Sequence, residues 1–170
     1  MGTNERAKIV MTPAEVADFL QRSRTATVAS IGPGGMPHVV AMWYGLIGDA
    51  VYIETKSKSQ KAVNLRRDPR MVFMIEAGDS YDTLRGVSLE GTGTIIEEAD
   101  GEEYWAAAIS VYERYTAPYA QDARPVLELM MNKRIVVKLV PERVRSWDHR
   151  KLGLGQMAPM GSTAASIGAE

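Results

Sequence analysis

Positive charge is concentrated in one segment of the chain, between residues 56 and 70. The chain of 170 residues has 20 Lys and Arg against 21 Asp and Glu, a net charge of −1, yet this segment holds six basic residues and one acid, Asp68. The basic residues are Lys56, Lys58, Lys61, Arg66, Arg67 and Arg70. A local charge of about +5 in a nearly neutral chain indicates a binding site for an anion.

The secondary structure predicted around the lysines favours phosphate as that anion. The lysines span the end of a predicted strand and the N-terminus of a helix predicted over residues 57–67, in which Ser57 and Gln60 form a capping box. A helix N-terminus offers unpaired N–H groups and the positive end of the helix dipole. Thr55 and Ser59 add hydroxyl donors at the same turn. We therefore predict a phosphate site where the strand meets the helix.

The three arginines that follow the lysines have two interpretations. The positive charge that begins at Lys56 and Lys61 runs over about three turns of helix if residues 57–67 are helical. Arg66, Arg67 and Arg70 could thus extend the site toward a ligand with more than one negative group. Alternatively, they face solvent and pair with the acidic run over residues 97–103, because charge runs usually lie on the surface. The sequence leaves both interpretations open.

Other kinds of chemistry have little support. The chain has no cysteine, and its two histidines, His38 and His149, are far apart and lack a serine or carboxylate partner at triad spacing. The glycines of residues 32–35 do not follow the dinucleotide-binding spacing and suit a hairpin turn. We expect no metal site and can name no catalytic residue. The near-zero net charge also argues against nucleic-acid binding.

The predicted elements alternate between short strands and a few helices. Thr12 and Glu15 form a capping box for a helix from Pro13 to Arg22. Strands are predicted over residues 25–30, 38–44, 50–55, 70–76, 85–97 and 134–140, and further helices over residues 57–67, 100–115 and 124–132. This order predicts an α+β fold, a six-stranded antiparallel barrel with flanking helices, in one domain over residues 1–153. The Gly, Ala and Ser-rich residues 154–170 read as a C-terminal tail.

No apolar run approaches the roughly 20 residues that span a bilayer, and the N-terminus lacks the apolar core of a secretion signal. We therefore expect a soluble, cytoplasmic protein without a membrane span.

Four segments resemble the pyridoxamine 5′-phosphate oxidase-like split-barrel family, and within it the branch that uses the deazaflavin cofactor F420. They are Pro37 to Val40, Lys56 to Arg70, Val87 to Gly93 and Trp147 to Gly153. The resemblance covers residues 12–153. It implies a split β-barrel that forms a homodimer, with cofactor clefts at the subunit interface, to which residues 81–85 or Trp147 contribute from the partner chain.

The resemblance also implies the residues that bind the cofactor. The family places the cofactor ring against its second strand, which corresponds here to Val39, Val40, Ala41, Met42 and Trp43. It holds the phosphate at the end of the third strand and the turn that follows, which corresponds to Thr55, Lys56, Ser57, Lys58, Gln60 and Lys61. The phosphate positions coincide with those that the charge pattern indicates.

The activity implied is that of an F420-dependent oxidoreductase, which transfers hydride from the reduced deazaflavin to a small conjugated or unsaturated acceptor. The proton would come from water or from Tyr44. An FMN-dependent oxidase or reductase of the same fold and a non-catalytic flavin- or haem-binding protein are the alternatives. The expected partners are a second copy of the chain and a small-molecule substrate.

Overall fold

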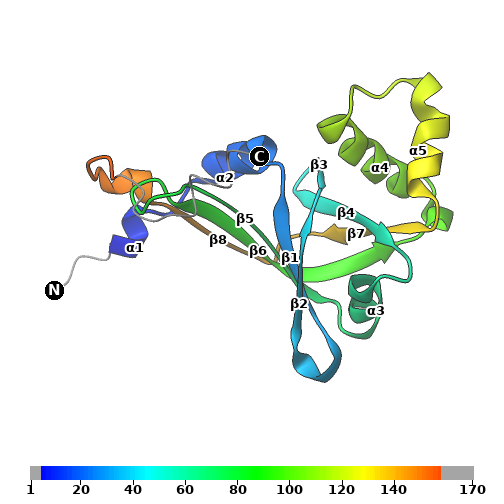
Figure 1. Ribbon diagram of the computed structural model, residues 1–170, viewed down its shortest axis with the longest axis horizontal. Coiled ribbons are helices and arrows are strands. Elements are labelled where there is room, and N and C mark those ends of the chain that lie inside the picture. Colours follow the sequence, from blue (N-terminus) through cyan, green and yellow to red (C-terminus); the bar gives the residue numbers. More distant parts are fainter. Residues whose placement is uncertain (1–4, 158–170) are drawn as a thin grey trace, which may run out of the picture. The chain divides into compact units, whose positions relative to one another are not determined.

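The computed structural model describes residues 5–157, which form two compact units (Figure 1). The first unit contains the residues up to Arg22, Ile75–Ser88 and the residues from Arg145. The second contains Ser23–Met74 and Leu89–Val144. Three strands include residues of both units: β5 (Arg70–Ala77), β6 (Arg85–Ile96) and β8 (Arg143–Asp148).

Helices and backbone hydrogen bonds organise the first unit. The short helix α1 (Glu5–Lys8) precedes α2 (Pro13–Arg22), whose bounds confirm the predicted helix. Its capping box also forms as predicted, because the N–H of Thr12 donates to Glu15 Oε2 over 2.6 Å and the N–H of Glu15 donates to Thr12 Oγ1 over 3.3 Å. The N–H of Asp148 donates to the carbonyl of Ile9, and η4 (His149–Leu152) follows directly.

The second unit is built on an antiparallel sheet. Strands β1 (Ala26–Ile31) and β2 (Pro37–Met42) form the predicted hairpin around η1 (Pro33–Gly35). The sheet runs in the order β2-β1-β5-β6-β7-β4-β3, so β2 is an edge strand. The remaining members of this path are β3 (Gly45–Ile47), β4 (Ala50–Lys56) and β7 (Arg134–Leu139), and the pairs β3–β4, β4–β7 and β6–β7 are all antiparallel.

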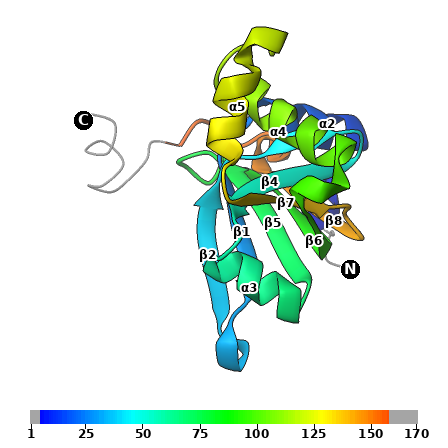
Figure 2. The ribbon, with the colours of Figure 1, turned by 90° about the vertical axis from the view of Figure 1, so that its right-hand side faces the viewer.

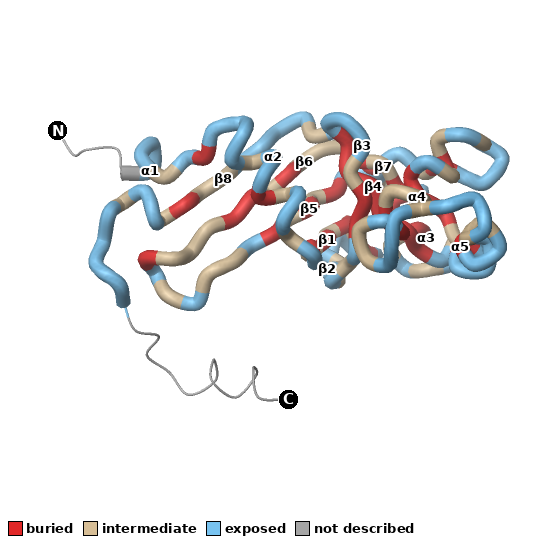
Figure 3. The backbone as a smooth tube through the Cα atoms, turned by 90° about the horizontal axis from the view of Figure 1, so that it is seen from above, coloured by how far each residue is buried: buried red, intermediate tan, exposed pale blue. Residues whose placement is uncertain are grey.

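Helices cover both sides of β4 and β7. Helices α4 (Glu102–Tyr115) and α5 (Arg124–Met131), with the short η2 (Glu98–Asp100) and η3 (Gln121–Ala123) before them, lie on one side, and α3 (Gln60–Arg67) lies on the other (Figures 1 and 2). The buried core gathers along β4 and β7 (Figure 3). Tyr104, Leu127 and Val136 are among the residues that join the two helices to the sheet. This packing holds both ends of β4 in place.

The helix that follows β4 begins later than predicted. Its cap is Ser59, whose Oγ accepts a hydrogen bond from the N–H of Ala62, and the helix starts at Gln60. The predicted capping box of Ser57 and Gln60 is therefore wrong. The difference comes from tertiary contacts. Strand β7 pairs with β4 as far as Lys56, and the N–H of Ser57 donates to the carbonyl of Lys133, so Ser57 belongs to the turn before the helix.

The structure has eight strands among its described residues where six were predicted. Strand β3 has only three residues, which pair with β4. Ser110 Oγ on α4 anchors it, because this hydroxyl accepts from the N–H of Leu46 and donates to its carbonyl. Strand β8 pairs with β6 and has exposed arginines at Arg143 and Arg145, a pattern typical of a polar loop. Neither strand has enough local apolar alternation to be found without its partner.

The C-terminal tail can be compared with its prediction only in part. Residues 153–157 form no helix or strand, and residues 158–170 lie outside the described residues. One domain over residues 1–153 stays a prediction. Within the described residues, no helix combines the length and the apolar character needed to cross a bilayer.

Candidate anion and cofactor site

Three residues predicted to bind phosphate are joined by hydrogen bonds at the end of β4. Lys61 Nζ donates to Thr55 Oγ1 over 3.0 Å, and Thr55 Oγ1 shares a hydrogen bond of 2.9 Å with Ser59 Oγ. Ser59 is also the residue that caps α3. An ammonium, two hydroxyls and a helix N-terminus thus meet at one turn, which is a donor set suited to phosphate.

The electrostatic environment of Lys61 leaves its charge without a carboxylate partner. Burial lowers the pKa of the Lys61 ammonium, and the charge of Arg134 lowers it further. Within the described part of the chain, its hydrogen-bond partner is the neutral hydroxyl of Thr55. A half-buried cation whose hydrogen bond goes to a neutral acceptor would gain from a bound anion.

The other residues predicted to bind phosphate differ in what their polar groups contact. Lys56 Nζ donates to the carbonyl of Asn132 over 2.8 Å, and the N–H of Ser57 donates to the carbonyl of Lys133 over 2.9 Å. Lys58 is exposed. Gln60 instead directs its amide to Asn64 Oδ1 over 2.8 Å. The turn between β4 and α3 therefore lies against the turn between α5 and β7.

The three arginines of the segment are all occupied by other parts of the protein. Arg66 pairs with Glu97 over 2.9 Å, which confirms the interpretation that places it beside the acidic run. Arg67 donates to the carbonyl of Ile31, and Arg70 makes an ion pair with Asp68 over 2.6 Å. The structure therefore does not support an anion site that continues along α3 through these arginines.

The predicted ring-binding strand presents an open apolar face. In β2, exposed residues alternate with half-buried ones, and Val39 and Ala41 fall on the exposed side. Trp43, directly after the strand, is exposed as well. Val39 and Trp43 are each 57% exposed. The other two candidates, Val40 and Met42, are half-buried on the opposite side. A flat ring could therefore lie against this face without displacing any core residue.

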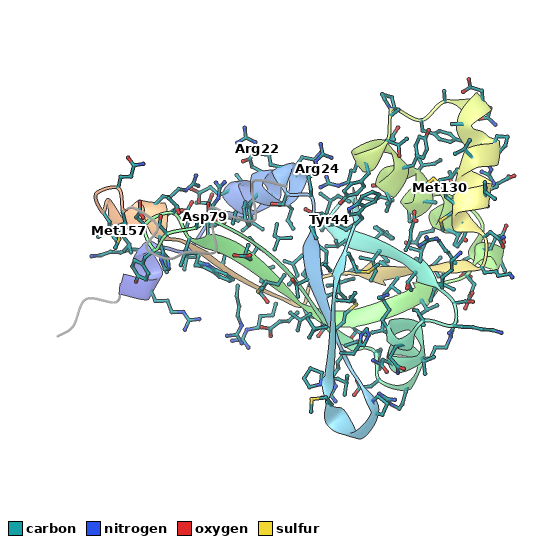
Figure 4. All side chains as sticks on the ribbon, in the orientation of Figure 1. Arg22, Arg24, Tyr44, Asp79, Met130 and Met157 are labelled. Atoms are coloured by element: carbon teal, nitrogen blue, oxygen red, sulfur yellow. The ribbon has the colours of Figure 1, made fainter. Side chains whose placement is uncertain are left out.

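Aromatic and cationic side chains fix the end of β2. Trp43 stacks on Tyr115 of α4, with ring centroids 4.4 Å apart. Tyr44 is fully buried, donates its hydroxyl to the carbonyl of Ser23 over 3.0 Å and lies beneath the guanidinium of Arg114. Burial raises the pKa of Tyr44 to about 12. The hydroxyl of Tyr44 is thus buried and already engaged, and a role for it as proton donor stays a prediction. Figure 4 shows Tyr44 near Arg24 at the same end of the β1–β2 hairpin.

The ring-binding and phosphate-binding candidates lie on different elements. Trp43 contacts the C-terminal end of α4, whereas Lys61 lies at the start of α3. Among residues 5–157, no hydrogen bond or ring contact joins the two sets. Both sets of residues belong to the second unit.

Two groups of site residues were missed by sequence reasoning. Lys133 and Arg134 adjoin the phosphate turn because β7 pairs with β4 in a register that sets Arg134 opposite Lys56. Tyr115 stacks on Trp43, and its hydroxyl accepts a hydrogen bond from the N–H of Tyr44, which lies 71 residues earlier in the chain. The local signal for the first group was a pair of adjacent cations, Lys133 and Arg134, at the start of a predicted strand.

The segments expected to contribute from a partner chain belong to the first unit. Tyr81 is 55% exposed, and its carbonyl lies 2.8 Å from His149 Nδ1. Trp147 lies against Gly86, where a Cβ atom would come within 2.2 Å of the indole. Their contribution to the cleft of a partner chain stays a prediction.

A curled antiparallel sheet with flanking helices defines an α+β fold of the split-barrel type, and a phosphate-type donor set lies at its β4–α3 turn. Residues 12–148 match the model of the pyridoxamine 5′-phosphate oxidase family, and the chain belongs to this family. No protein of curated function matches the chain significantly.

Solved structures extend this comparison. The conserved hypothetical protein Rv2991 from Mycobacterium tuberculosis is 57% identical, with a TM-score of 0.89, and the match covers 95% of this chain and 100% of that one. A protein described as an F420 reductase is 23% identical, with a TM-score of 0.54, over 75% of this chain and 94% of that one. HutZ, described as a haem storage protein from Vibrio cholerae, is 15% identical, with a TM-score of 0.65, over 79% and 94%. The last two likenesses show a shared fold.

Proposed function

We propose that this protein is an oxidoreductase that binds the deazaflavin cofactor F420 and transfers hydride from its reduced form to a small conjugated or unsaturated acceptor. The observation that carries this proposal is the cluster of Lys61, Thr55 and Ser59. Its half-buried ammonium has a neutral partner and lies at a helix N-terminus. A phosphate at this turn would supply the missing negative charge and accept hydrogen bonds from all three side chains.

The exposed face of β2 is suited to the ring of the same kind of cofactor. Val39 and Trp43 offer apolar contact, and Ala41 between them has a side chain small enough for close approach to the backbone. When bound, the cofactor supplies the hydride chemistry, and the protein residues supply orientation and an environment that excludes water. Because Tyr44 is buried, a proton would reach the acceptor from water.

A second copy of the chain is the partner that this proposal requires. Strand β2 is at the edge of its sheet, and Val39 on the strand is exposed, as are Met36 and Trp43 at its two ends. Such an edge exposes unpaired backbone groups as well as apolar area, which proteins usually cover. We propose that a homodimer covers part of this surface and leaves a cleft for the cofactor and a small-molecule substrate.

The decisive experiment is a titration of the purified protein with F420 and with FMN, followed by fluorescence, and then addition of acceptors to the bound reduced cofactor. We expect F420 to bind more tightly than FMN and its reduced form to be oxidised by an unsaturated acceptor. Tighter binding of FMN would replace the F420 proposal by an FMN-dependent activity of the same fold. Binding without turnover of any acceptor would support a non-catalytic flavin-binding protein, and binding of haem alone would overturn the flavin proposal.

A further inference from the structure

Asn64 of α3 is a polar residue at 0% exposure, and its side-chain amide is hydrogen-bonded at both ends. Its Nδ2 donates to Ser30 Oγ on β1 over 3.1 Å, and its Oδ1 accepts from Gln60 Nε2 over 2.8 Å. Ser30 is itself only 2% exposed. Asn64 therefore makes a directional bond between the helix and the strand inside the protein.

Packing alone would not favour asparagine at this position. The other buried residues of α3, Ala62 and Leu65, are apolar. Removal of an amide from water costs free energy, which its hydrogen bonds offset only when the partner groups are correctly placed. Because the bond from Asn64 to Ser30 is favourable in one alignment, it fixes where α3 lies along β1, which an apolar contact would do less strictly.

This bond lies between the two sets of candidate cofactor residues. The phosphate cluster consists of Thr55, Ser59 and Lys61. On the helix side of the bond, Asn64 lies one turn after Lys61 of this cluster. On the strand side, Ser30 is paired with His38 in the β1–β2 ladder, next to Val39 on the exposed face of β2.

A change in the contact between α3 and β1 would be transmitted to both sets. Helix α3 packs against β1, and the edge strand β2 has β1 as its neighbour in the sheet (Figure 2). A shift of α3 along β1 would therefore move Ser59 and Lys61 relative to the ring-binding face of β2. Asn64 and Ser30 thus connect indirectly two sets that no direct contact joins among residues 5–157.

We propose that Asn64 is a positioning residue, which sets the distance between the phosphate cluster and the ring-binding face of β2 so that one ligand can bind both. This inference rests on the proposed function, because it takes the two sets as halves of one cofactor site. Since Asn64 is buried, it acts through the helix and not by contact with the cofactor. Correct spacing lets the second half of a ligand bind at a high effective concentration once the first half is bound.

The test separates linked binding from the binding of each half. Fluorescence titration and calorimetry measure the affinity for FMN and F420, which carry both ring and phosphate, for riboflavin, which carries the ring, and for inorganic phosphate. Asn64→Leu keeps a buried side chain of similar size and removes the bond to Ser30. We expect this variant to bind FMN and F420 about tenfold more weakly and to bind riboflavin and phosphate within about twofold of the wild type.

A second variant and a control accompany this measurement. Ser30→Ala breaks the same bond from the strand side and tests the proposal even if Asn64→Leu folds poorly. It should give the same pattern, and the double variant should lose no more affinity than either single one, because the two residues share one bond. Val87→Ala, which removes buried apolar atoms from the first unit, is the control for lost stability and should change none of the four affinities.

The outcomes distinguish this inference from the proposed function. Equal loss of all four ligands in Asn64→Leu, or of none, would overturn the positioning role while flavin binding by the wild type stands. Loss of inorganic phosphate together with FMN would also overturn it, because Asn64 would then act on the phosphate cluster alone. If the wild type binds no flavin, the proposed function fails, and hydrogen exchange then decides. Protection of the β1–β2 hairpin by millimolar phosphate that Asn64→Leu abolishes would support the positioning role, and absence of this protection would overturn it.

Discussion

The indole ring of Trp43 lies parallel to the phenol ring of Tyr115, with an angle of 3° between their planes and 4.4 Å between their centroids. The stack connects the end of β2 to the end of α4. Tyr115 is itself fixed, because its hydroxyl accepts from the N–H of Tyr44 over 3.1 Å and donates to the carbonyl of Arg24 over 2.6 Å. Trp43 is therefore an exposed ring held in one orientation, and it offers a flat surface prepared in advance for a planar ligand.

Replacement of Trp43 should affect ligand binding more than stability. Because the side chain is 57% exposed, we expect Trp43→Ala to lower the unfolding free energy by only about 1 kcal/mol, the part due to the lost stack. Cofactor affinity should fall by about tenfold, as measured by fluorescence titration. Leu129→Ala, at an exposed apolar position on α5, is the matched control and should leave affinity unchanged. An unaltered affinity in Trp43→Ala would remove this ring from the site.

Loss of the Lys61 ammonium should weaken only ligands that carry phosphate. We expect Lys61→Met to reduce the affinity for F420 and for FMN by about 1 to 3 kcal/mol, the value of a charge-assisted hydrogen bond. Riboflavin, which has no phosphate, should bind the variant and the wild type equally. Stability should not fall, because burial lowers the pKa of Lys61 and its cation is therefore costly to the fold. Equal loss for riboflavin and FMN would show that Lys61 acts through folding instead.

Glu54 should make the protein less stable as the pH rises. Burial raises the pKa of Glu54 to about 7 from an ordinary value of 4.5, although the charge of Arg134 partly opposes this. The folded state therefore holds the proton more tightly than the unfolded state, so stability is full below about pH 4.5 and is lost as the pH rises through 7. The shift corresponds to about 3 kcal/mol at alkaline pH.

Substitution by glutamine isolates this effect. Thermal unfolding of Glu54→Gln should give a higher Tm than the wild type at pH 8, and the gain should shrink toward pH 5. Glu128→Gln, an exposed acid paired with Arg124 on α5, should show no such pH-dependent gain. A Tm gain for Glu54→Gln that is the same at both pH values would refute the assignment of the raised pKa to Glu54.

Gly86 should tolerate no side chain, because Trp147 occupies the space. A Cβ atom there would lie 2.2 Å from the indole, a distance that forces the ring or the strand to move. We expect Gly86→Ala to lower the unfolding free energy by about 1 to 3 kcal/mol, measured by chemical denaturation. Gly155→Ala is the control, since a Cβ at Gly155 meets no atom within 4 Å. Equal stability of the two variants would contradict the close packing of Trp147.

The protein should sediment as a dimer at twice its chain mass of 18.7 kDa. We expect Val39→Arg to produce folded monomers, because it places a charge on the exposed face of the edge strand β2. Leu129→Arg on α5 should remain dimeric. Dissociation by the α5 variant and not by the β2 variant would place the interface on the helix.

The local sequence determined the elements that have complete signals of their own. The helix from Pro13 to Arg22 was predicted with its bounds because Thr12 and Glu15 complete their hydrogen bonds within one turn. The hairpin of β1 and β2 was predicted because a glycine-rich turn joins two apolar strands. The charge pattern likewise located the phosphate cluster, since Thr55, Ser59 and Lys61 lie within seven residues.

Tertiary structure decided what depends on contacts between distant segments. Strand β3 pairs with β4 and is anchored by hydrogen bonds between Ser110 and Leu46, and α3 begins only at Gln60 because β7 holds the turn before it. Pairing with β7 also brought Lys133 beside the phosphate turn, 72 residues after Lys61, while Glu97 neutralised Arg66. The residue types show where charge and apolar surface are available. Only the sheet register decides which charges meet, because electrostatic and hydrogen-bond energies depend on distances that the order of residues along the chain does not specify.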